Sequence, residues 1–455
     1  MKNIFILACL FIIVSCSAQQ STDNKSKEIV FRNVNVIPMD KEQVLMNQDV
    51  VVKDGKIISI KPASKSNYGK NAIVVDAKGK YLMPGLAEMH AHVPPVDDIA
   101  PMKDVVMLFV LKGVTTIRGM LGHPRHIELR SKIESGEIIG PRFITSGPSF
   151  NGNSVKTPEA AAAMVREQKK AGYDFLKLHP GLTKENFAAI AATAKEVNIP
   201  FAGHVSFDVG VWLAIDAGYA TIDHLDGFVE SLVPGIENMK ESETGLFSLF
   251  IADKADESGI QRLTDSLRNH HIWVVPTQAL AERWFHPARD ADALGKEDEM
   301  KYMDAETMNN WTNTKKNLLK NPNYKASTAT KLIEIRRKLI AACNQNGVGL
   351  LLGSDAPQVF DVPGFSVHHE LQYLVDAGLS PYDAIKTGTL NVGRFLNRED
   401  IGVIKVGAVS DLILLNGNPL ENINNTKNIE GVMLRNLWFP KDYIQAELKK
   451  LEKNK

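Results

Sequence analysis

Residues 83–93 read MPGLAEMHAHV and carry two histidines near their end, His90 and His92. An apolar run of this length, bounded by Pro and Gly, is typical of a buried β-strand. Side chains at positions i and i+2 of a strand face the same side, so both imidazoles point the same way. The stretch therefore predicts a strand that delivers a pair of imidazoles to one point.

Between residues 84 and 399, strand-like runs alternate with helical sequence. After residue 93 the runs are GVTTIRG, PRFITSG, DFLKLH, PFAGHV, ATIDHL, IWVVPT and GVGLLLGSD. Eight such runs in this order predict an α/β fold, a (β/α)8 barrel. The links 226–270 and 278–346 are longer than a plain barrel needs, and we expect them to form helical insertions that make a lid or rim over one barrel face.

The two ends of the chain have a different sequence pattern. Residues 28–83 consist of short β-rich runs with a hairpin signal at Asp54-Gly55, and β-rich sequence returns in residues 400–455. Each piece is too short to bury a core alone. We therefore expect the two pieces to pair into one small β-sandwich domain beside the barrel, followed by a C-terminal tail.

Residues 1–27 read as a leader rather than as part of the fold. Residues 1–15 carry one Lys and a short apolar run, which is typical of a secretory signal, and the ending resembles a lipoprotein box with Cys16 as the lipidated residue. Residues 16–27 would then be a tether. This predicts a lipid-anchored protein of the bacterial cell envelope, on the outer membrane and facing the periplasm. An ordinary cleaved signal and a later start site are the alternatives.

Three further chemistry-bearing residues fall at predicted strand ends. His204 ends the fifth strand, His224 the sixth and Asp355 the eighth. The C-terminal strand ends of a parallel barrel meet at one mouth, so these side chains should join His90 and His92 there. Imidazoles with a carboxylate suit a divalent cation such as Zn²⁺. Taken singly, each histidine has a structural alternative, and Asp355 has a helix-capping one.

This set of motifs resembles the metal-dependent amidohydrolase superfamily, in its binuclear prolidase-like or imidazolonepropionase-like branch. The resemblance rests on GLAEMHAH at 85–92, on the two later histidines, on GSDA at 353–356 and on KVGAVSDLILLNGNPL at 405–420. It implies that the paired histidines hold the more buried metal and the two later histidines hold the outer one. It also implies that Asp355 both binds metal and moves protons.

Lys177 lies within the fourth predicted strand, where a single buried ammonium is costly unless it is neutralised or paired. The resemblance implies that CO₂ carboxylates Lys177 to an anionic bridge between two divalent metal ions, most simply Zn²⁺. A buried ion pair with Asp174 or Asp355 is the alternative.

Residues near the mouth are candidates for contacts with substrate. His179 follows Lys177 by two positions and Ser206 follows His204 by two, while Thr277 and Gln278 follow the seventh strand. Arg283 lies in the insertion after that strand and is a candidate partner for a substrate carboxylate.

We therefore predict a hydrolase that cleaves a C–N amide bond of a dipeptide or N-acyl amino acid by a metal-bridged hydroxide, with Asp355 as general base and acid. Lactones, cyclic amides and phosphotriesters are alternative substrates, and a non-catalytic metal- or nutrient-binding lipoprotein is the alternative of another class. The 53 basic and 53 acidic residues balance, which gives no reason to expect a nucleic-acid partner. The sequence leaves assembly into a homo-oligomer open.

Overall fold

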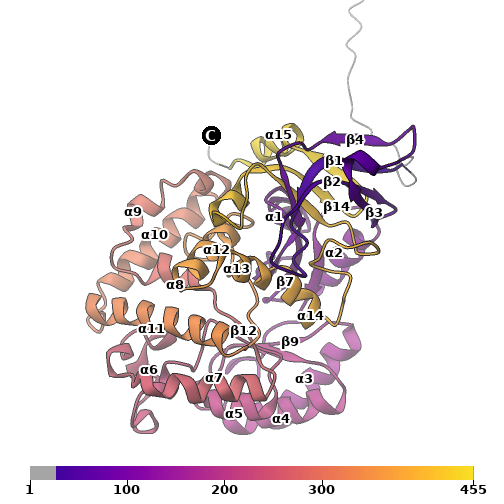
Figure 1. Ribbon diagram of the computed structural model, residues 1–455. Coiled ribbons are helices and arrows are strands. Elements are labelled where there is room, and N and C mark those ends of the chain that lie inside the picture. Colours follow the sequence, from indigo (N-terminus) through magenta and orange to yellow (C-terminus); the bar gives the residue numbers. More distant parts are fainter. Residues whose placement is uncertain (1–26, 454–455) are drawn as a thin grey trace, which may run out of the picture.

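The computed structural model describes residues 27–453, so the predicted signal peptide, Cys16 and nearly all of the predicted tether lie outside the described residues. Within them, seven parallel strands follow the predicted runs and form two sheets, in the orders β6-β7-β8 and β12-β11-β10-β9 (Figure 1). The strands are β6 (Leu86–Ala91), β7 (Val114–Gly119), β8 (Arg142–Thr145), β9 (Leu176–Leu178), β10 (Phe201–Gly203), β11 (Thr221–Asp223) and β12 (Trp273–Val275).

Shorter contacts join the two sheets into a closed barrel. On one side, single bridges pair Ser146 with Phe175 and Phe150 with Leu178, which extends β8 alongside β9. On the other side, the eighth predicted run lies between β12 and β6. There Leu351 N donates to the carbonyl oxygen of Val274 at 2.9 Å.

The eighth run closes the barrel without forming a regular strand. The amide of Met89 in β6 donates to the carbonyl oxygen of Leu352 at 2.7 Å, but the Leu352 amide donates to Thr387, at the end of a helix. Because the Leu352 amide bonds to the end of this helix, it cannot continue the ladder of backbone hydrogen bonds toward β6. The predicted (β/α)8 architecture is confirmed, with an irregular eighth position.

Helices connect the strands and cover the outside of the barrel. Several begin at residues whose side chains accept a hydrogen bond from the first turn: Thr157 caps α3 and Thr183 caps α4. The covering helices are α1 (Ala100–Leu111), α2 (Pro124–Glu134), α3 (Pro158–Ala171), α4 (Lys184–Glu196), α5 (Gly210–Ala217), α7 (Ile260–Asn269), α11 (Ala326–Gln345), α12 (Ser366–Asp376), α13 (Pro381–Thr387) and α14 (Leu390–Phe395). Across residues 27–453, no helix has both the length and the apolar character that a membrane crossing requires.

The two long links are helical, as expected. Between β11 and β12 the chain forms short 3-10 turns and α6 (Glu241–Thr244) ahead of α7. Between β12 and the eighth run it forms α8 (Gln278–Trp284), α9 (Ala291–Leu294) and α10 (Ala305–Leu319) ahead of α11. In Figure 1, α9 and α10 lie together at one side of the molecule, next to α11.

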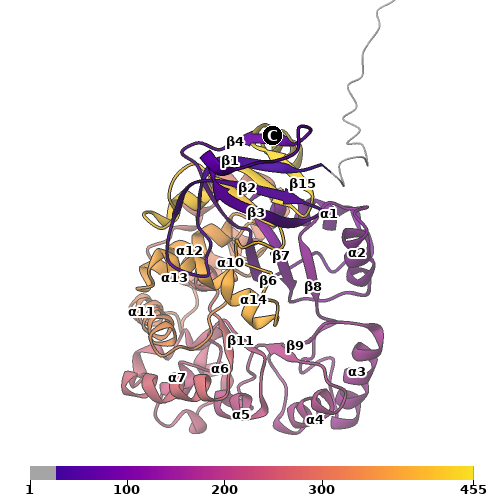
Figure 2. The ribbon, with the colours of Figure 1, turned by 45° about the vertical axis from the view of Figure 1, so that its right-hand side comes forward.

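Strands from both chain ends form one eight-stranded sheet at the end of the molecule away from α4 and α5 (Figures 1 and 2). The two ends meet where β5 pairs antiparallel with β13. The strands are β1 (Ile29–Val36), β2 (Leu45–Lys53), β3 (Lys56–Pro62), β4 (Ile73–Asp76), β5 (Tyr81–Pro84), β13 (Leu412–Leu415), β14 (Ile429–Leu434) and β15 (Leu437–Pro440). The C-terminal helix α15 (Lys441–Leu451) follows and packs against α1.

Two hydrophobic clusters fix the sheet in place. One lies within it and includes Phe31, Leu82 and Leu414. The other is the main barrel core, which also takes in Met83 of β5 and Ile413 of β13 from the sheet. Because residues from both ends of the chain enter the barrel core, the sheet is anchored to the barrel. The predicted domain boundaries at 83/84 and 399/400 stay predictions.

Candidate metal centre at the barrel mouth

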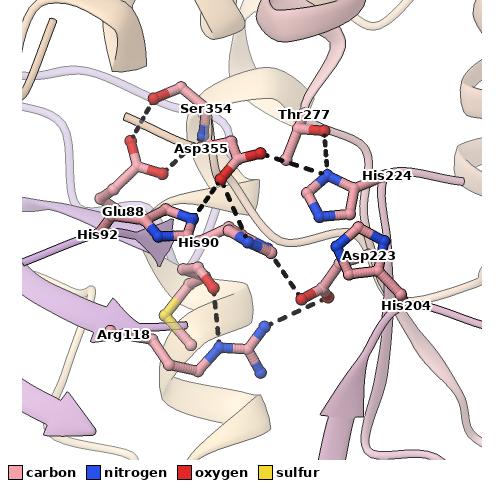
Figure 3. Close-up of polar contacts among 12 residues, drawn as sticks. Glu88, His90, His92, Arg118, His204, Asp223, His224, Thr277, Ser354 and Asp355 are labelled. Carbon is pink, nitrogen blue, oxygen red and sulfur yellow. Dashed lines mark hydrogen bonds and ion pairs between the residues drawn. The ribbon is translucent and has the colours of Figure 1, made fainter. Parts of the chain in front are cut away.

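His90, His92 and Asp355 meet at the C-terminal end of the barrel, although 263 positions separate the last two in sequence (Figure 3). The Nε2 atom of His92 lies 2.6 Å from Asp355 Oδ1, and the Nε2 atom of His90 lies 3.3 Å from the same oxygen. The ligand atoms of all three side chains lie within 4.8 Å of one another. Such spacing of imidazole and carboxylate donors suits a single cation.

His204 and His224 lie beside this group. The ring centroid of His224 is 4.4 Å from that of His90 and 4.4 Å from that of His204, and its Nδ1 atom is 3.8 Å from Asp355 Oδ2. The structure therefore brings all four predicted histidines and Asp355 to one place.

Three of the four imidazoles are oriented by a partner at Nδ1. The partner is Asp223 for His90 at 2.9 Å, Asp226 for His204 at 2.9 Å and the Thr277 hydroxyl for His224 at 2.8 Å. A partner at Nδ1 fixes the ring and leaves Nε2 free to bind a metal. Consistent with this, His224 Nε2 is buried and has no hydrogen-bond partner among the described residues.

The partners of the ligand residues are themselves held. Asp223 accepts from the Thr221 hydroxyl at 2.7 Å and lies 3.4 Å from an Arg118 guanidinium nitrogen. Arg118 is buried and also donates to the carbonyl oxygen of Met89 at 2.7 Å (Figure 3). Side chains from β7 and β11 therefore brace a histidine on β6.

The residue before Asp355 is anchored too. Ser354 donates its amide to Glu88 at 2.6 Å and its hydroxyl to the other Glu88 oxygen at 2.8 Å. The Asp355 amide donates to the carbonyl oxygen of His90 at 2.9 Å, while the Asp355 backbone has φ 71°. A left-handed conformation is strained for aspartate, so these bonds hold the carboxylate in an otherwise disfavoured position.

Lys177 lies on β9, fully buried, and its Nζ has no hydrogen-bond partner among the described residues. The predicted alternative, an ion pair with Asp174 or Asp355, is not formed. Asp174 instead accepts from Arg130 at 2.7 Å, and Asp355 lies against His90 and His92. Burial lowers the pKa of Lys177 to about 8, against the opposing effect of nearby carboxylates.

Gly203 makes room for this lysine. A side chain at position 203 would meet the Leu178 carbonyl oxygen at 2.5 Å and the Lys177 Nζ at 3.0 Å, and the backbone there has φ 123°. Only glycine fits both restrictions without strain.

The electrostatics of the group favour a bound cation. Burial lowers the pKa of His204 to about 3 and lowers the pKa values of His90 and His224 well below the usual range, so their imidazoles are neutral at pH 7. Neutral imidazoles offer lone pairs, and the buried His224 Nε2 and Lys177 Nζ atoms are unpaired. The residues thus fit a metal centre in which Lys177 also becomes a ligand.

The two other candidates on this side of the barrel lie close by. The His179 ring centroid is 4.9 Å from that of His204, and its Nδ1 is buried without a partner among residues 27–453. Ser206 is buried, and its hydroxyl accepts from the Leu182 amide at 3.0 Å while donating to the His179 carbonyl oxygen at 3.3 Å. Ser206 therefore fastens the loop that carries His179.

The structure does not bring Gln278 and Arg283 to the mouth. Gln278 is buried and its side-chain oxygen accepts from Arg336 at 3.0 Å. Arg283 is buried too, pairs with Glu297 and donates to the Phe360 carbonyl oxygen at 2.9 Å. The prediction that Arg283 meets a substrate carboxylate needs correction, because α8 turns its guanidinium into the protein, where internal acceptors already use its donors.

A cavity of about 1080 Å³ adjoins the metal centre. The loops after β9 and β10 line it, and so does the insertion between β11 and β12. Asp226 borders both the cavity and His204, and the Phe247 ring lies parallel to that of His204 with centroids 6.0 Å apart. The cavity thus reaches the site through Asp226 and Phe247, and its lining includes none of the four histidines, Lys177 or Asp355.

Sequence reasoning missed the carboxylates that orient the histidines. Asp223 precedes His224 directly and Asp226 follows it by two positions, so TIDHLD was their signal. Nothing local distinguishes them from other acidic residues, because each is recognised by a histidine on a different strand.

The chain is similar to known proteins in sequence and in fold. Relatives of similar sequence include the adenine deaminase of Mesorhizobium japonicum (strain LMG 29417 / CECT 9101 / MAFF 303099), 30% identical over 210 residues; that alignment covers 40% of this chain and 34% of the deaminase. The chain thus matches only about a third of that relative's length.

Solved structures of similar fold cover far more of the chain. A bottromycin amidohydrolase superposes with a TM-score of 0.69 at 20% identity, covering 93% of this chain and 91% of that one. A Xaa-Pro dipeptidase with methionine bound in its active site gives a TM-score of 0.66 at 19% identity, covering 91% and 100%. Residues 81–436 match the model of the amidohydrolase family, and the chain belongs to that family.

Proposed function

We propose that this protein is a metal-dependent hydrolase that cleaves the C–N amide bond of a dipeptide or N-acyl amino acid. The observation that carries the proposal is the convergence of four imidazoles, Asp355 and the unpaired Lys177 at the barrel mouth. The fold shared with a Xaa-Pro dipeptidase supports the choice of a peptide-like substrate.

The ligand residues divide into two groups. His90, His92 and Asp355 would hold one divalent cation, and His204 and His224 a second, with Lys177 between them. The neutral amine of Lys177 would add to CO₂, forming an N–C bond and releasing one proton, and so become an anionic ligand. When bound, two Zn²⁺ ions would lower the pKa of a shared water and polarise the scissile carbonyl.

Asp355 would move the proton. Its carboxylate lies against His90 and His92 on one side and 3.8 Å from His224 on the other, so it borders both groups of ligands. From there it would accept a proton from the attacking water and deliver it to the leaving amine. The bonds that Ser354 makes to Glu88 keep this carboxylate in place during both transfers.

The proposal extends to location. Lipidation of Cys16 and a tether would attach the barrel to the bacterial cell envelope, on the outer membrane and facing the periplasm, which suits an enzyme that scavenges peptides. The support is the sequence of residues 1–16. Loss of membrane association in a full-length Cys16→Ala protein would be the expected result.

The test is a mass-spectrometric screen of the protein from Ser17 to Lys455, loaded with Zn²⁺ and bicarbonate. The panel contains pooled dipeptides and N-acyl amino acids, together with lactones, cyclic amides and phosphotriesters. Adenine is included because a sequence relative is an adenine deaminase. Cleavage of amides that is lost in Asp355→Asn, with metal content unchanged, is expected. A metal-replete protein that hydrolyses only the other classes would refute an amide substrate, and one that binds metal without any turnover would point to a binding protein.

A further inference from the structure

One buried nitrogen beside the metal centre is not used by the ligand set proposed above. The Nδ1 atom of His179 has no hydrogen-bond partner among residues 27–453. The buried His368, by contrast, uses both ring nitrogens, which contact the Thr426 hydroxyl and the Lys112 carbonyl oxygen at 3.0 Å each. A buried polar atom without a partner is rare in a folded protein, so His179 Nδ1 indicates a group that binds beside it.

The strand register places Lys177 and His179 on the inner face of the barrel. Leu178 of β9 pairs with Gly203 of β10. One step further along both chains His179 lies beside His204, and their ring centroids are 4.9 Å apart. Side chains two positions apart on a strand share a face, so Lys177 faces the same interior as the His179 ring.

The amine of Lys177 extends toward the level of His179. Its Nζ atom lies 3.0 Å from the place that a side-chain carbon on residue 203 would occupy, one position before His204. Burial and then the charge of Lys177 lower the pKa of the His179 imidazole, which shows that the two groups are close. The Lys177 Nζ likewise has no hydrogen-bond partner within the described part of the chain. Two unpartnered nitrogens therefore lie together at one depth of the barrel.

Carboxylation of Lys177 would give His179 a partner. The amine nitrogen forms a bond to the carbon of CO₂ and releases one proton, and the product ends in a pair of anionic oxygens. Like a carboxylate, such a group has more lone pairs than two metal ions use, so one remains to accept a hydrogen bond. An imidazole carries at least one N–H donor, and its bond to an anionic oxygen is stronger than a bond to a neutral acceptor.

The ligand count argues against a role of His179 as a further metal ligand. In the proposed function His204, His224 and the carboxylated Lys177 already give the outer cation three protein ligands, and a catalytic zinc keeps its next position open. Resting on that carboxylation, we propose that His179 is a positioning residue whose ring N–H donates to the carbamate of Lys177. The bond would stabilise the carbamate and fix the direction in which its oxygens face.

The experiment measures the carbamate directly and needs no substrate. Protein from Ser17 to Lys455 is equilibrated with Zn²⁺ and a series of concentrations of ¹³C-labelled bicarbonate. Carbon NMR counts the carbamate per protein, and elemental analysis counts the zinc. In His179→Phe, half-maximal carboxylation should need about 10-fold more bicarbonate or more, because a hydrogen bond to an anion is lost. At saturating bicarbonate the carbamate and the zinc content should both match those of wild type.

Further variants separate the hydrogen bond from the packing of the ring. Phenylalanine keeps a ring against His204 and lacks both nitrogens, and His179→Leu serves in its place if that protein does not fold. His179→Asn restores an N–H donor and should need less bicarbonate than His179→Phe. His270→Phe, an exposed change at the end of α7, is the matched control and should behave as wild type.

Three results would overturn the inference. They are the same bicarbonate dependence in His179→Phe and wild type, loss of zinc from His179→Phe even at saturating bicarbonate, which would make His179 a metal ligand, and absence of a carbamate from the zinc-loaded wild type. The substrate screen decides the proposed hydrolysis separately. A carbamate that depends on His179 in a protein that cleaves no amide would support the inference and refute the amide substrate alone.

Discussion

Replacing Lys177 by methionine should stabilise the metal-free protein. The side chain is fully buried, and its Nζ lacks a hydrogen-bond partner among the described residues. Methionine has similar length and no charge, so Lys177→Met removes the cost of burying an ammonium without leaving a cavity. The same change should abolish metal binding that depends on carboxylated Lys177.

The size of the effect follows from the lysine pKa. Burial lowers it from 10.5 to about 8. A difference of this size corresponds to about 3 kcal/mol. The pKa of Lys177 is lower in the folded state than in the unfolded state. Below pH 8 the ammonium is therefore present in both states, and the folded protein bears the full cost of burying it. As pH rises from 8 to 10.5 the folded state alone loses its proton, and wild type becomes more stable.

Lys177→Met should thus raise the free energy of unfolding by about 3 kcal/mol at pH 7 and by about 1 kcal/mol at pH 10. Urea unfolding of chelator-treated protein, free of bicarbonate, measures both values.

Lys315 is the matched control. It is also buried, but its ammonium donates to the carbonyl oxygens of Arg283, Trp284 and His286 at 2.8, 2.9 and 3.2 Å. Burial lowers the pKa of Lys315 to about 8 as well, but Lys315→Met also leaves three buried carbonyl acceptors without their donor. The free energy of unfolding at pH 7 should therefore rise by clearly less than in Lys177→Met, or fall. A Lys177→Met protein that is no more stable than wild type at pH 7 would show that Lys177 is compensated in the metal-free state.

Other residues give independent tests. Asp223→Asn should weaken metal affinity about 10- to 100-fold by releasing His90, measured by titration against a competing chelator; unchanged affinity would contradict the orienting role. Arg336→Met should destabilise the fold by about 3 kcal/mol in urea, because a buried guanidinium that donates to the His224 carbonyl oxygen is lost; a change below about 1 kcal/mol would argue against it. Burial raises the pKa of Cys343 to about 12, so in the protein from Ser17 to Lys455 this single thiol should resist disulfide reagents until guanidinium is added, and reaction in the native state would contradict its burial.

The sequence alone predicted the barrel and the convergence of the four histidines and Asp355 at its mouth. The two-residue repeat of a β-strand places His90 and His92 on one face. The alternation of strands and helices predicts a parallel barrel, in which His204, His224 and Asp355 lie at strand ends that share one mouth. These inferences succeed because each depends on a short local pattern combined with one rule of topology.

Contacts between distant segments were decided by the tertiary structure. Gln278 and Arg283 follow a strand that leads to the mouth, yet both side chains are buried on α8, which begins directly after Thr277 with its φ of 47°. A single left-handed residue redirects the helix, and no local preference predicts it, since threonine disfavours that conformation.

The partners of the histidines have the same origin. Asp223 lies more than a hundred positions from His90 in sequence, and Asp226 lies about twenty positions from His204. Each pair comes into contact only when the barrel brings the two segments together. Likewise the cavity combines loops that follow three different strands. The sequence determines which charged and histidine side chains are present. Closure of the barrel determines which of them share a buried space, where water screens charges only weakly. In that space, the presence or absence of a hydrogen-bond or ion-pair partner determines the chemistry of each side chain.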